Sequence, residues 1–158
     1  MIDALARSSA RLAAVQALYE MEITGIDADS VEEEFATFRF GREPEISPGH
    51  PDEAFFSDVV HGVPQRQGEI DAEIAACLAE DWRLSRVDSI VRAILRAGAY
   101  ELIARADVPA KVVVDEYVEL AHDFFAEDEA PFVNAALDRL AHKKRPAEFG
   151  GPAPDDQF

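Results

Sequence analysis

Residues 85–102, SRVDSIVRAILRAGAYEL, carry the clearest structural pattern in the sequence. Their apolar residues recur at the spacing of one face of an α-helix. These residues are Val87, Ile90, Val91, Ile94, Leu95 and Leu102. Three arginines, Arg86, Arg92 and Arg96, lie off this apolar face. The stretch therefore predicts an amphipathic helix, capped by Ser85 at its start, that packs into a helical core.

The same spacing recurs on both sides of this helix. Further helices are expected at residues 5–22, 29–38, 52–61, 65–79, 109–124 and 132–140. Gly25 is expected to end the first of them, Asp29 or Ser30 to cap the second, and Gly62 with Pro64 to separate the third from the fourth. No stretch alternates with period two for long enough to form a strand. The predicted fold class is therefore all-α, a compact bundle of about seven helices.

The length of 158 residues predicts a single domain, which we place at residues 1–145. Residues 39–51 contain three prolines and two glycines, so they are expected to form a loop. Residues 146–158 also contain three prolines and two glycines and offer few groups that could pack. They are predicted to be a disordered C-terminal tail.

The chain is strongly acidic. It has 32 aspartates and glutamates against 15 lysines and arginines, a formal net charge of −17. Such a chain as a whole repels a polyanion, so nucleic-acid binding requires a local basic patch or a basic partner protein. The sequence has neither a run of about 18 apolar residues nor a secretory signal at its start. We therefore expect a cytoplasmic protein.

Signals for catalysis or metal binding are weak. The histidines His50, His61, His122 and His142 lack the spacing of metal ligands. Glycine-rich phosphate loops and nucleophile elbows are absent from the sequence. Cys77 lies on an apolar helical face and is expected to be an inert core thiol. The sequence thus predicts no enzymatic activity, no cofactor and no metal.

The placement of the few basic residues is more informative. Arg7 and Arg11 lie four residues apart near the start of the first helix, and residues 4–19 contain no acidic residue. A helix start also favours anions through its free N–H groups and its dipole. A second basic cluster, residues 142–145, ends the last helix, where cations complement the dipole. Taken alone, both clusters also fit a solvated helix surface.

Several segments together indicate a family. Residues 7–19, RSSARLAAVQALY, resemble the opening helix of the NusB family of bacterial transcription antitermination factors. Matching segments follow in the family's order: FSDVVHGV at 56–63, WRLSR at 82–86, ILRAGAYEL at 94–102, VDEYVELA at 114–121 and FVNAALD at 132–138. The resemblance covers about residues 5–140, and its strength lies in the number of segments in order.

The resemblance implies a non-enzymatic RNA-binding factor with an all-helical fold. Members of the family pair with NusE, which is also a ribosomal protein of the small subunit. The pair binds the boxA element of ribosomal RNA operons and, with other Nus factors, keeps RNA polymerase from terminating early. A basic ribosomal partner would resolve the charge problem, because it supplies the cations that this acidic chain lacks.

The resemblance also implies roles for individual residues. The RNA-binding residues would be Arg7, Ser8, Arg11, Gln16, Tyr19 and Phe132. The residues that bind the protein partner would be Glu101, Asp115, Glu116, Glu119 and Asp128. By spacing alone, Tyr19 and Phe132 lie close to apolar faces and would be assigned to the core.

This sequence departs from the family at several places, and Asp115-Glu116 stands where relatives commonly have an Asn-Glu pair. Ser8 and Ser9 replace arginines that many relatives have, and Val91 replaces a residue that is often acidic. Two alternatives to RNA binding therefore stay open. One is a protein-interaction module or homodimer that does not bind RNA, and the other is an accessory domain for ribosomal RNA modification.

Overall fold

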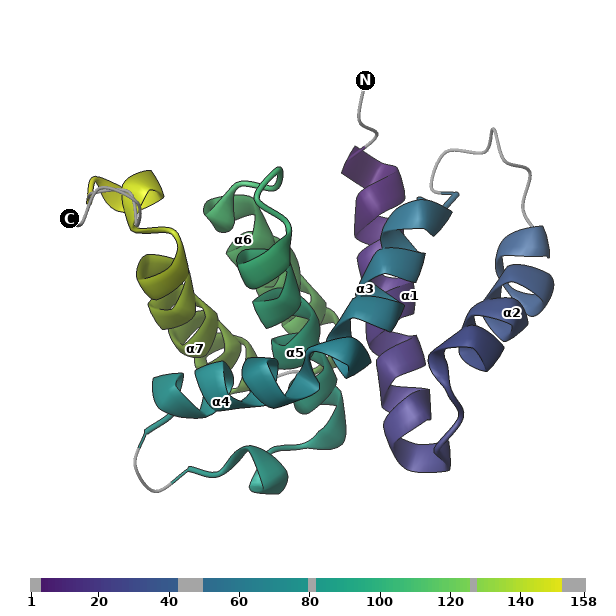
Figure 1. Cartoon of the computed structure of the whole chain (residues 1–158), viewed down its shortest axis with the longest axis horizontal. Helices are drawn as coiled ribbons and strands as arrows, with labels where there is room; N and C mark the ends of the chain where they lie inside the picture. Colours follow the sequence, from purple (N-terminus) through teal and green to yellow (C-terminus); the bar gives the residue numbers. More distant parts are fainter. Residues whose placement is uncertain (1–3, 43–49, 80–81, 126–127, 152–158) are drawn as a thin grey trace. The chain divides into compact units, whose positions relative to one another are not determined.

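The computed structural model describes residues 4–42, 50–79, 82–125 and 128–151. Over these ranges the chain is helical (Figure 1). The α-helices are α1 (Ala4–Thr24), α2 (Ala28–Phe38), α3 (Glu53–Gln65), α4 (Gln67–Cys77), α5 (Ser89–Ala104), α6 (Ala110–Phe124) and α7 (Glu129–Lys144). Three short 3₁₀ helices are η1 (Phe40–Arg42), η2 (Leu84–Arg86) and η3 (Pro146–Phe149). The predicted all-α class with seven helices is confirmed for the described residues.

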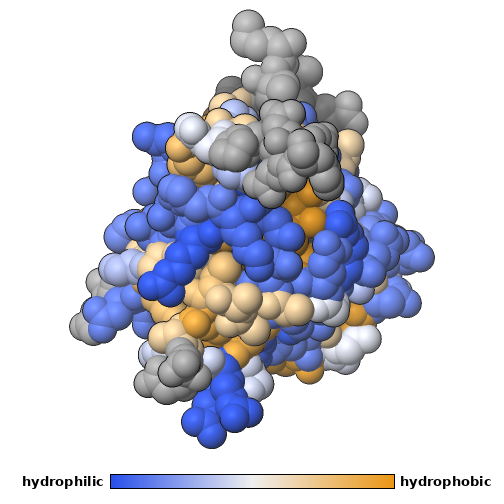
Figure 2. All heavy atoms as spheres, turned by 60° about the vertical axis from the view of Figure 1, so that its left-hand side comes forward, coloured by the Kyte–Doolittle hydropathy of each residue, from blue (hydrophilic) through white to orange (hydrophobic). Residues whose placement is uncertain are grey.

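The helices group into two compact units, Met1–Arg66 and Gln67–Phe158. The first unit holds α1, α2, η1 and α3, and the second holds the remaining helices. The single domain expected from the chain length therefore stays a prediction. Figure 2 shows the side of the molecule on which α7 lies: hydrophilic residues cover most of the described surface, with apolar residues exposed between them. Among the described helices, none has the length and apolar character needed to cross a lipid bilayer.

In the first unit, α1 packs against α3 through small residues. Ala10, Ala13, Ala14 and Ala17 are fully buried, so the two helices approach closely. Asp52 joins the same two helices: its carboxylate caps α3 by accepting from the N–H of Phe55 at 3.0 Å, and its own N–H donates to the carbonyl of Ala6 at 3.0 Å. These contacts hold the beginning of α1 against the beginning of α3.

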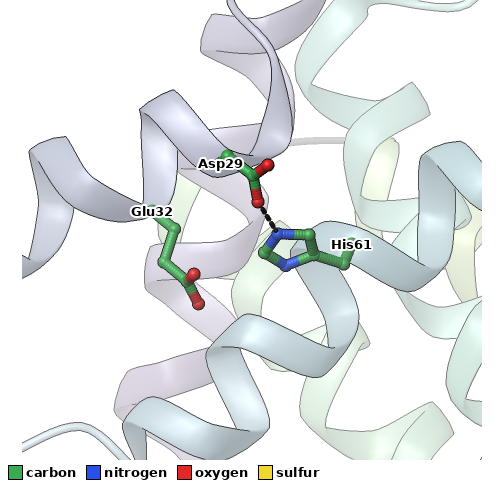
Figure 3. Close-up of side chains that lie close together, drawn as sticks. All are labelled: Asp29, Glu32 and His61. Atoms are coloured by element: carbon green, nitrogen blue, oxygen red, sulfur yellow. Dashed lines mark hydrogen bonds and ion pairs between the residues drawn. The ribbon is translucent and has the colours of Figure 1, made fainter.

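The same unit links α2 to α3 through an aromatic cluster and one ion pair. The rings of Phe35 and Phe56 stack at 5.3 Å between centroids, and Phe40 meets Phe56 edge-on at 4.9 Å. The Nε2 of His61 on α3 lies 2.9 Å from a carboxylate oxygen of Asp29 on α2 (Figure 3). The hydrogen bond with Asp29 is the main reason why the pKa of His61 is raised above its usual value.

In the second unit, α5 is the central helix and packs against α4, α6 and α7. Gly98 lets α5 and α7 approach closely, because a Cβ there would lie 2.8 Å from the Cδ1 of Leu137 and would force that side chain to move. Glu101 is completely buried on this helix, where its carboxylate accepts a hydrogen bond from the hydroxyl of Tyr117 on α6. A core polar pair therefore joins the two helices.

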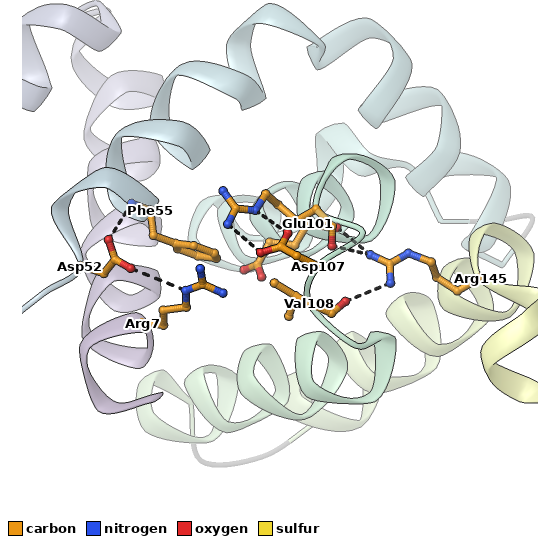
Figure 4. A network of polar contacts seen from close by, with 8 residues as sticks. Arg7, Asp52, Phe55, Glu101, Asp107, Val108 and Arg145 are labelled. Carbon is orange, nitrogen blue, oxygen red and sulfur yellow. Dashed lines mark hydrogen bonds and ion pairs between the residues drawn. The ribbon is translucent and has the colours of Figure 1, made fainter. Parts of the chain in front are cut away.

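Arg145 directly follows α7, and its side chain binds the C-terminal end of α5 (Figure 4). Its guanidinium donates to the carbonyls of Leu102 at 2.9 Å, Glu101 at 3.1 Å and Arg105 at 2.8 Å. It also donates to the carbonyl of Val108 at 2.9 Å, in the connection to α6. The last carbonyls of a helix have no partner within the helix, so one side chain here satisfies several of them.

The rest of the C-terminal basic cluster is also engaged within the unit. Lys143 and Lys144 lie 3.1 and 3.2 Å from the carboxylate of Glu73 on α4. Burial acts to raise the pKa of Glu73, but hydrogen bonds from the two lysines outweigh it and lower the pKa below its usual value. The ring of His142 stacks on Phe149 at 3.8 Å between centroids. The cluster thus ties α7 to its neighbours within this unit.

Several helix ends are shifted by a few residues from the sequence prediction, as in α4 and α7, and three predicted capping or breaking sites differ in kind. Helix α5 begins at Ser89 and is capped by Asp88, whose carboxylate accepts from the N–H of Ile90 at 2.8 Å; Ser85 lies instead in η2. Arg92 holds that short helix by donating to the carbonyls of Leu84 and Val87. The cap of α2 is Asp27, which accepts from the N–H of Ser30 at 2.8 Å, so the prediction of Asp29 or Ser30 was wrong.

The third difference is that α3 continues through Gly62 and Pro64 to Gln65. Proline removes one hydrogen bond from a helix and its ring crowds the preceding turn, so local propensity disfavours a helix at Pro64. Gly62 is itself buried, as are Val60 and Val63 on either side, so tertiary packing outweighs the low helix propensity of this segment. Gly25 does end α1, with a left-handed φ of 79°.

Two loop predictions are also revised. In the predicted tail, residues 146–151 are ordered: Glu148 in η3 accepts from the N–H of Ala110 at 2.8 Å and from Arg145 at 2.7 Å. These hydrogen bonds, that from Ala110 above all, lower the pKa of Glu148. Residues 152–158 lie outside the described residues. In the predicted loop 39–51, Phe40–Arg42 form η1, and residues 43–49 lie outside the described residues.

Replacing Arg145 tests its part in the second unit. Arg145→Ala is expected to lower the melting temperature by roughly 4–8 °C, because several buried carbonyls lose a charged donor. Arg145→Lys is expected to have a melting temperature between those of Arg145→Ala and the native protein, since an ammonium cannot reproduce the planar fork of donors. Thermal unfolding followed by circular dichroism measures both. A melting temperature unchanged in Arg145→Ala would contradict this account.

The ion pair of His61 predicts a pH-dependent contribution to stability. Because the pKa of His61 is raised on folding, the stabilisation is present below the usual histidine pKa and is lost as the pH rises through the raised value. Asp29→Asn should therefore destabilise the protein more at pH 6 than at pH 9. The difference should stay below about 1 kcal/mol, since Asp29 is largely exposed. Urea unfolding at both pH values measures it, and the difference should vanish in a His61→Gln background.

Candidate nucleic-acid interface

The two arginines of α1 lie in different environments. The guanidinium of Arg7 lies 4.8 Å from the ring centroid of Phe55, and its Nε lies 3.6 Å from the carboxylate of Asp52 (Figure 4). Its side chain keeps 16% of its surface exposed. Arg11 lies 5.0 Å from the same ring but is only 3% exposed. Arg7 therefore reaches the surface, whereas Arg11 is a packing residue in this structure.

The other predicted residues of α1 are accessible to different degrees. Tyr19 is 37% exposed, so the core position that its spacing suggested is wrong. Ser8 is half-buried. Gln16 is also half-buried, and its side-chain carbonyl accepts a hydrogen bond from the guanidinium of Arg39, the residue after α2. Gln16 and Tyr19 thus provide a hydrogen-bonding group and an exposed aromatic ring on α1.

Arg39 is a residue that the sequence analysis missed. Its guanidinium lies 5.4 Å from the ring centroid of Phe35 and donates to Gln16. This arrangement places a further cation next to a predicted RNA-binding residue. The sequence held only a weak signal, because Arg39 belongs to the segment that was assigned to a loop.

In the second unit, Phe132 lies in the first turn of α7 and is half-buried. Its ring meets that of Trp82 at 5.3 Å between centroids. Trp82 is 50% exposed, which is a large exposed area for this side chain. The sequence analysis treated Trp82 only as part of a connector, although a tryptophan in a polar connector is a recognisable signal for a binding surface.

The residues predicted to bind the protein partner divide into two groups. Asp115 and Glu119 are exposed on α6, Glu116 is half-buried there, and Asp128 is exposed at the start of α7. Glu101 has no exposed surface. Its predicted contact with a partner is therefore contradicted: a carboxylate sealed in the core stabilises the unit instead of touching another protein.

An exposed apolar residue accompanies the acidic residues of α6. Val112 is 42% exposed and precedes Asp115, Glu116 and Glu119 by one or two helical turns, so it shares a face with them. An acidic face with an apolar side chain fits a basic partner that also buries some apolar surface.

One group of side chains has the composition of a metal site. Ligand atoms of Asp29, Glu32 and His61 all lie within 4.8 Å of one another (Figure 3). The Nδ1 of His61 lies 2.9 Å from the carbonyl of Ser57, and its Nε2 faces Asp29. Because both neighbours accept hydrogen bonds, this arrangement favours the protonated ring, which agrees with the raised pKa of His61. The cluster is thus satisfied as an ion pair, and the expectation that the protein holds no metal stays a prediction.

Cys77 is the one cysteine of the chain. It is 6% exposed, and burial raises the pKa of its thiol above the usual value. A buried, protonated thiol is a poor nucleophile. The structure therefore agrees with the prediction of an inert core residue.

Comparison with known proteins identifies the family. The model of the NusB family matches residues 8–142. The transcription antitermination protein NusB of Maricaulis maris is 52% identical over 146 residues, which cover 90% of each chain. NusB of Caulobacter vibrioides is 51% identical over 140 residues, which cover 88% of this chain and 94% of the relative.

The fold agrees with this result. NusB of T. maritima superposes with a TM-score of 0.74 and 28% identity, covering 91% of this chain and 96% of that one. A crystal structure of the antitermination factors NusB and NusE with double-stranded RNA contains a chain that matches with a TM-score of 0.72 and 21% identity, covering 86% of this chain and 96% of that one. This chain therefore belongs to the NusB family of transcription antitermination proteins, which are not enzymes.

Proposed function

We propose that this protein binds boxA-type RNA of ribosomal RNA operons together with NusE. The observation that carries the proposal is the acid-free part of α1, which presents the partly exposed Arg7 and the exposed Tyr19 in a chain with a net charge of −17. A cation and an aromatic ring are the groups with which proteins hold single-stranded RNA. The chain also shares its fold with a chain of the solved complex of NusB and NusE with double-stranded RNA.

The electrostatics explain why a partner is needed. Each phosphate contact requires a cation, so a surface with few available cations binds RNA weakly, and its binding depends only weakly on salt. Arg7 is partly engaged by Asp52, and Arg11 is buried, so α1 alone offers little free positive charge. A basic ribosomal protein such as NusE supplies the remaining cations and reduces the repulsion between this chain and the RNA.

The acidic face of α6 is the surface that we assign to NusE. Asp115, Glu116 and Glu119, with the exposed Val112, give it negative charge and apolar area, and Asp128 adds a further exposed carboxylate at the start of α7. Charge complementarity of this kind accelerates association and selects a basic partner. Other Nus factors and RNA polymerase, in the cytoplasm, complete the proposed assembly.

The roles of Arg7 and Arg11 lead to distinct predictions. In the complex with NusE, Arg7→Ala should weaken boxA RNA binding and reduce the salt slope by about 0.7, the value for one phosphate contact on a single strand. The melting temperature should fall less than in Arg11→Ala, because the Arg7 side chain keeps 16% of its surface exposed. Arg11→Ala should instead lower the melting temperature, because its buried guanidinium packs on Phe55. Fluorescence anisotropy of labelled RNA and thermal unfolding measure the two effects.

Lys143→Ala is the matched control. It removes a cation in the last turn of α7 that pairs with Glu73 of α4. RNA affinity should not change in this variant. If Lys143→Ala weakened RNA binding as much as Arg7→Ala does, the assignment of α1 would be wrong. If the native pair bound no RNA at low salt, the protein would be a protein-interaction module or a homodimer, and sedimentation would show which.

A further inference from the structure

Trp82 and Phe132 form an aromatic pair whose exposure the fold does not require. Trp82 lies between α4 and η2, where its backbone N–H donates to the carbonyl of Ala79 at 2.9 Å. Its ring contacts Phe132 at an interplanar angle of 44°, yet half of the Trp82 surface stays exposed. Leaving so large an apolar ring in water forgoes stabilisation that full burial would bring. The exposed half of the Trp82 surface can contact a ligand.

The pair belongs to a pocket of about 500 Å³. Its apolar lining consists of Trp82, Phe132, Val87 and Val91. This volume is within the range of small-molecule sites and is large enough for a planar ring with an attached sugar. The segment that carries Trp82 continues into η2. The guanidinium of Arg92 donates to the carbonyls of Leu84, at the start of η2, and Val87, directly after it. Arg92 thus joins α5 to the segment that forms one wall of the pocket.

The polar lining of the pocket selects the kind of ligand. Three acidic residues, Asp88, Asp128 and Glu129, line the pocket together with one basic residue, Arg86. The carboxylate of Asp88 is occupied in part by the cap of α5, whereas Asp128 makes no such cap for α7. Excess negative charge disfavours a phosphate inside the pocket. It favours a neutral ring that donates N–H groups, because carboxylates only accept hydrogen bonds.

We propose that Trp82 and Phe132 hold one unpaired nucleobase of the bound RNA, whose amino group donates to the pocket carboxylates. This inference rests on the proposed RNA binding and adds to it a base-binding pocket centred on Trp82. The aromatic rings supply the stacking surface, and Asp128 and Glu129 supply acceptors for the base edge. Arg86, at the pocket, is placed for an adjoining phosphate. Bases with an amino group are preferred over uracil.

The one tryptophan of the chain makes the pocket directly observable. The complex of the full chain with NusE is titrated with single-stranded boxA oligoribonucleotides, each carrying one abasic position. Binding of the intact RNA should quench the emission of Trp82, and one abasic position should abolish the quenching. The Trp82→Phe complex serves as the blank for any emission from the partner.

Variants give the size of the effect. Trp82→Ala should weaken RNA binding roughly 5- to 150-fold, and Trp82→Phe by less than about threefold, because a phenyl ring still stacks. Replacing the recognised base by uracil should weaken binding to the native complex. Phe149→Ala is the matched control: Phe149 is 39% exposed and also stacks on another ring, that of His142, but at the opposite end of α7. RNA affinity should not change in this variant.

The outcomes separate the inference from the function on which it rests. RNA binding by the native complex without quenching, and with equal affinity in Trp82→Ala, would overturn the pocket assignment while leaving RNA binding intact. Quenching by NusE alone, with weaker NusE binding by Trp82→Ala, would assign the pocket to the protein partner and overturn the inference. Failure of the native complex to bind labelled RNA at low salt would refute both. Melting temperatures of the variants identify any loss of folding, in which case Trp82→Phe and the abasic series decide.

Discussion

The scarcity of cations is the constraint on which this structure depends. With 15 basic residues against 32 acidic ones, a cation used inside the protein is lost to any external anion. The second unit uses several of its cations internally. Arg96 forms a two-pronged pair with Asp71, Lys143 and Lys144 hold Glu73, and Arg145 holds the end of α5. Each of these cations joins elements that lie far apart in the sequence, and all of them lie outside α1.

This distribution gives the proposed RNA surface its character. On α1 the positive charge consists of one partly exposed arginine and one buried arginine, and Arg39 adds a third cation beside Gln16. Such a surface has aromatic and hydrogen-bonding groups but little net charge. Its affinity for RNA should therefore depend on stacking and on a basic partner more than on its own ion pairs with phosphate.

The sequence predicted the elements better than their boundaries or the burial of their polar residues. The apolar spacing of residues 85–102 located α5 correctly, because that spacing is fixed by helix geometry. It misplaced the cap, since Arg92 folds residues 84–86 into a separate 3₁₀ turn through contacts that spacing does not encode. Gly62 and Pro64 failed as breaks because packing of α3 overrides local propensity. The ordered residues 146–151 depend on Glu148 reaching Ala110, which only the folded chain brings near.

The candidate site shows the same division. Resemblance to the NusB family selected residues that are exposed or half-buried, such as Tyr19, Phe132 and Asp128, but also Glu101, which lies wholly in the core. Family motifs record that a residue matters, not whether it acts on a ligand or on the fold. Trp82 was missed because its significance comes from a ring contact with Phe132 on another helix.

The central claim is that this acidic chain holds RNA through a small accessible surface only when a cationic protein accompanies it. The most direct measurement compares the dissociation constant of boxA RNA for the chain alone, for NusE alone and for their complex, over a range of salt concentrations. The account predicts that the complex binds far more tightly than either protein and with a steeper salt dependence than this chain alone. Equal affinity of the chain with and without NusE would contradict it.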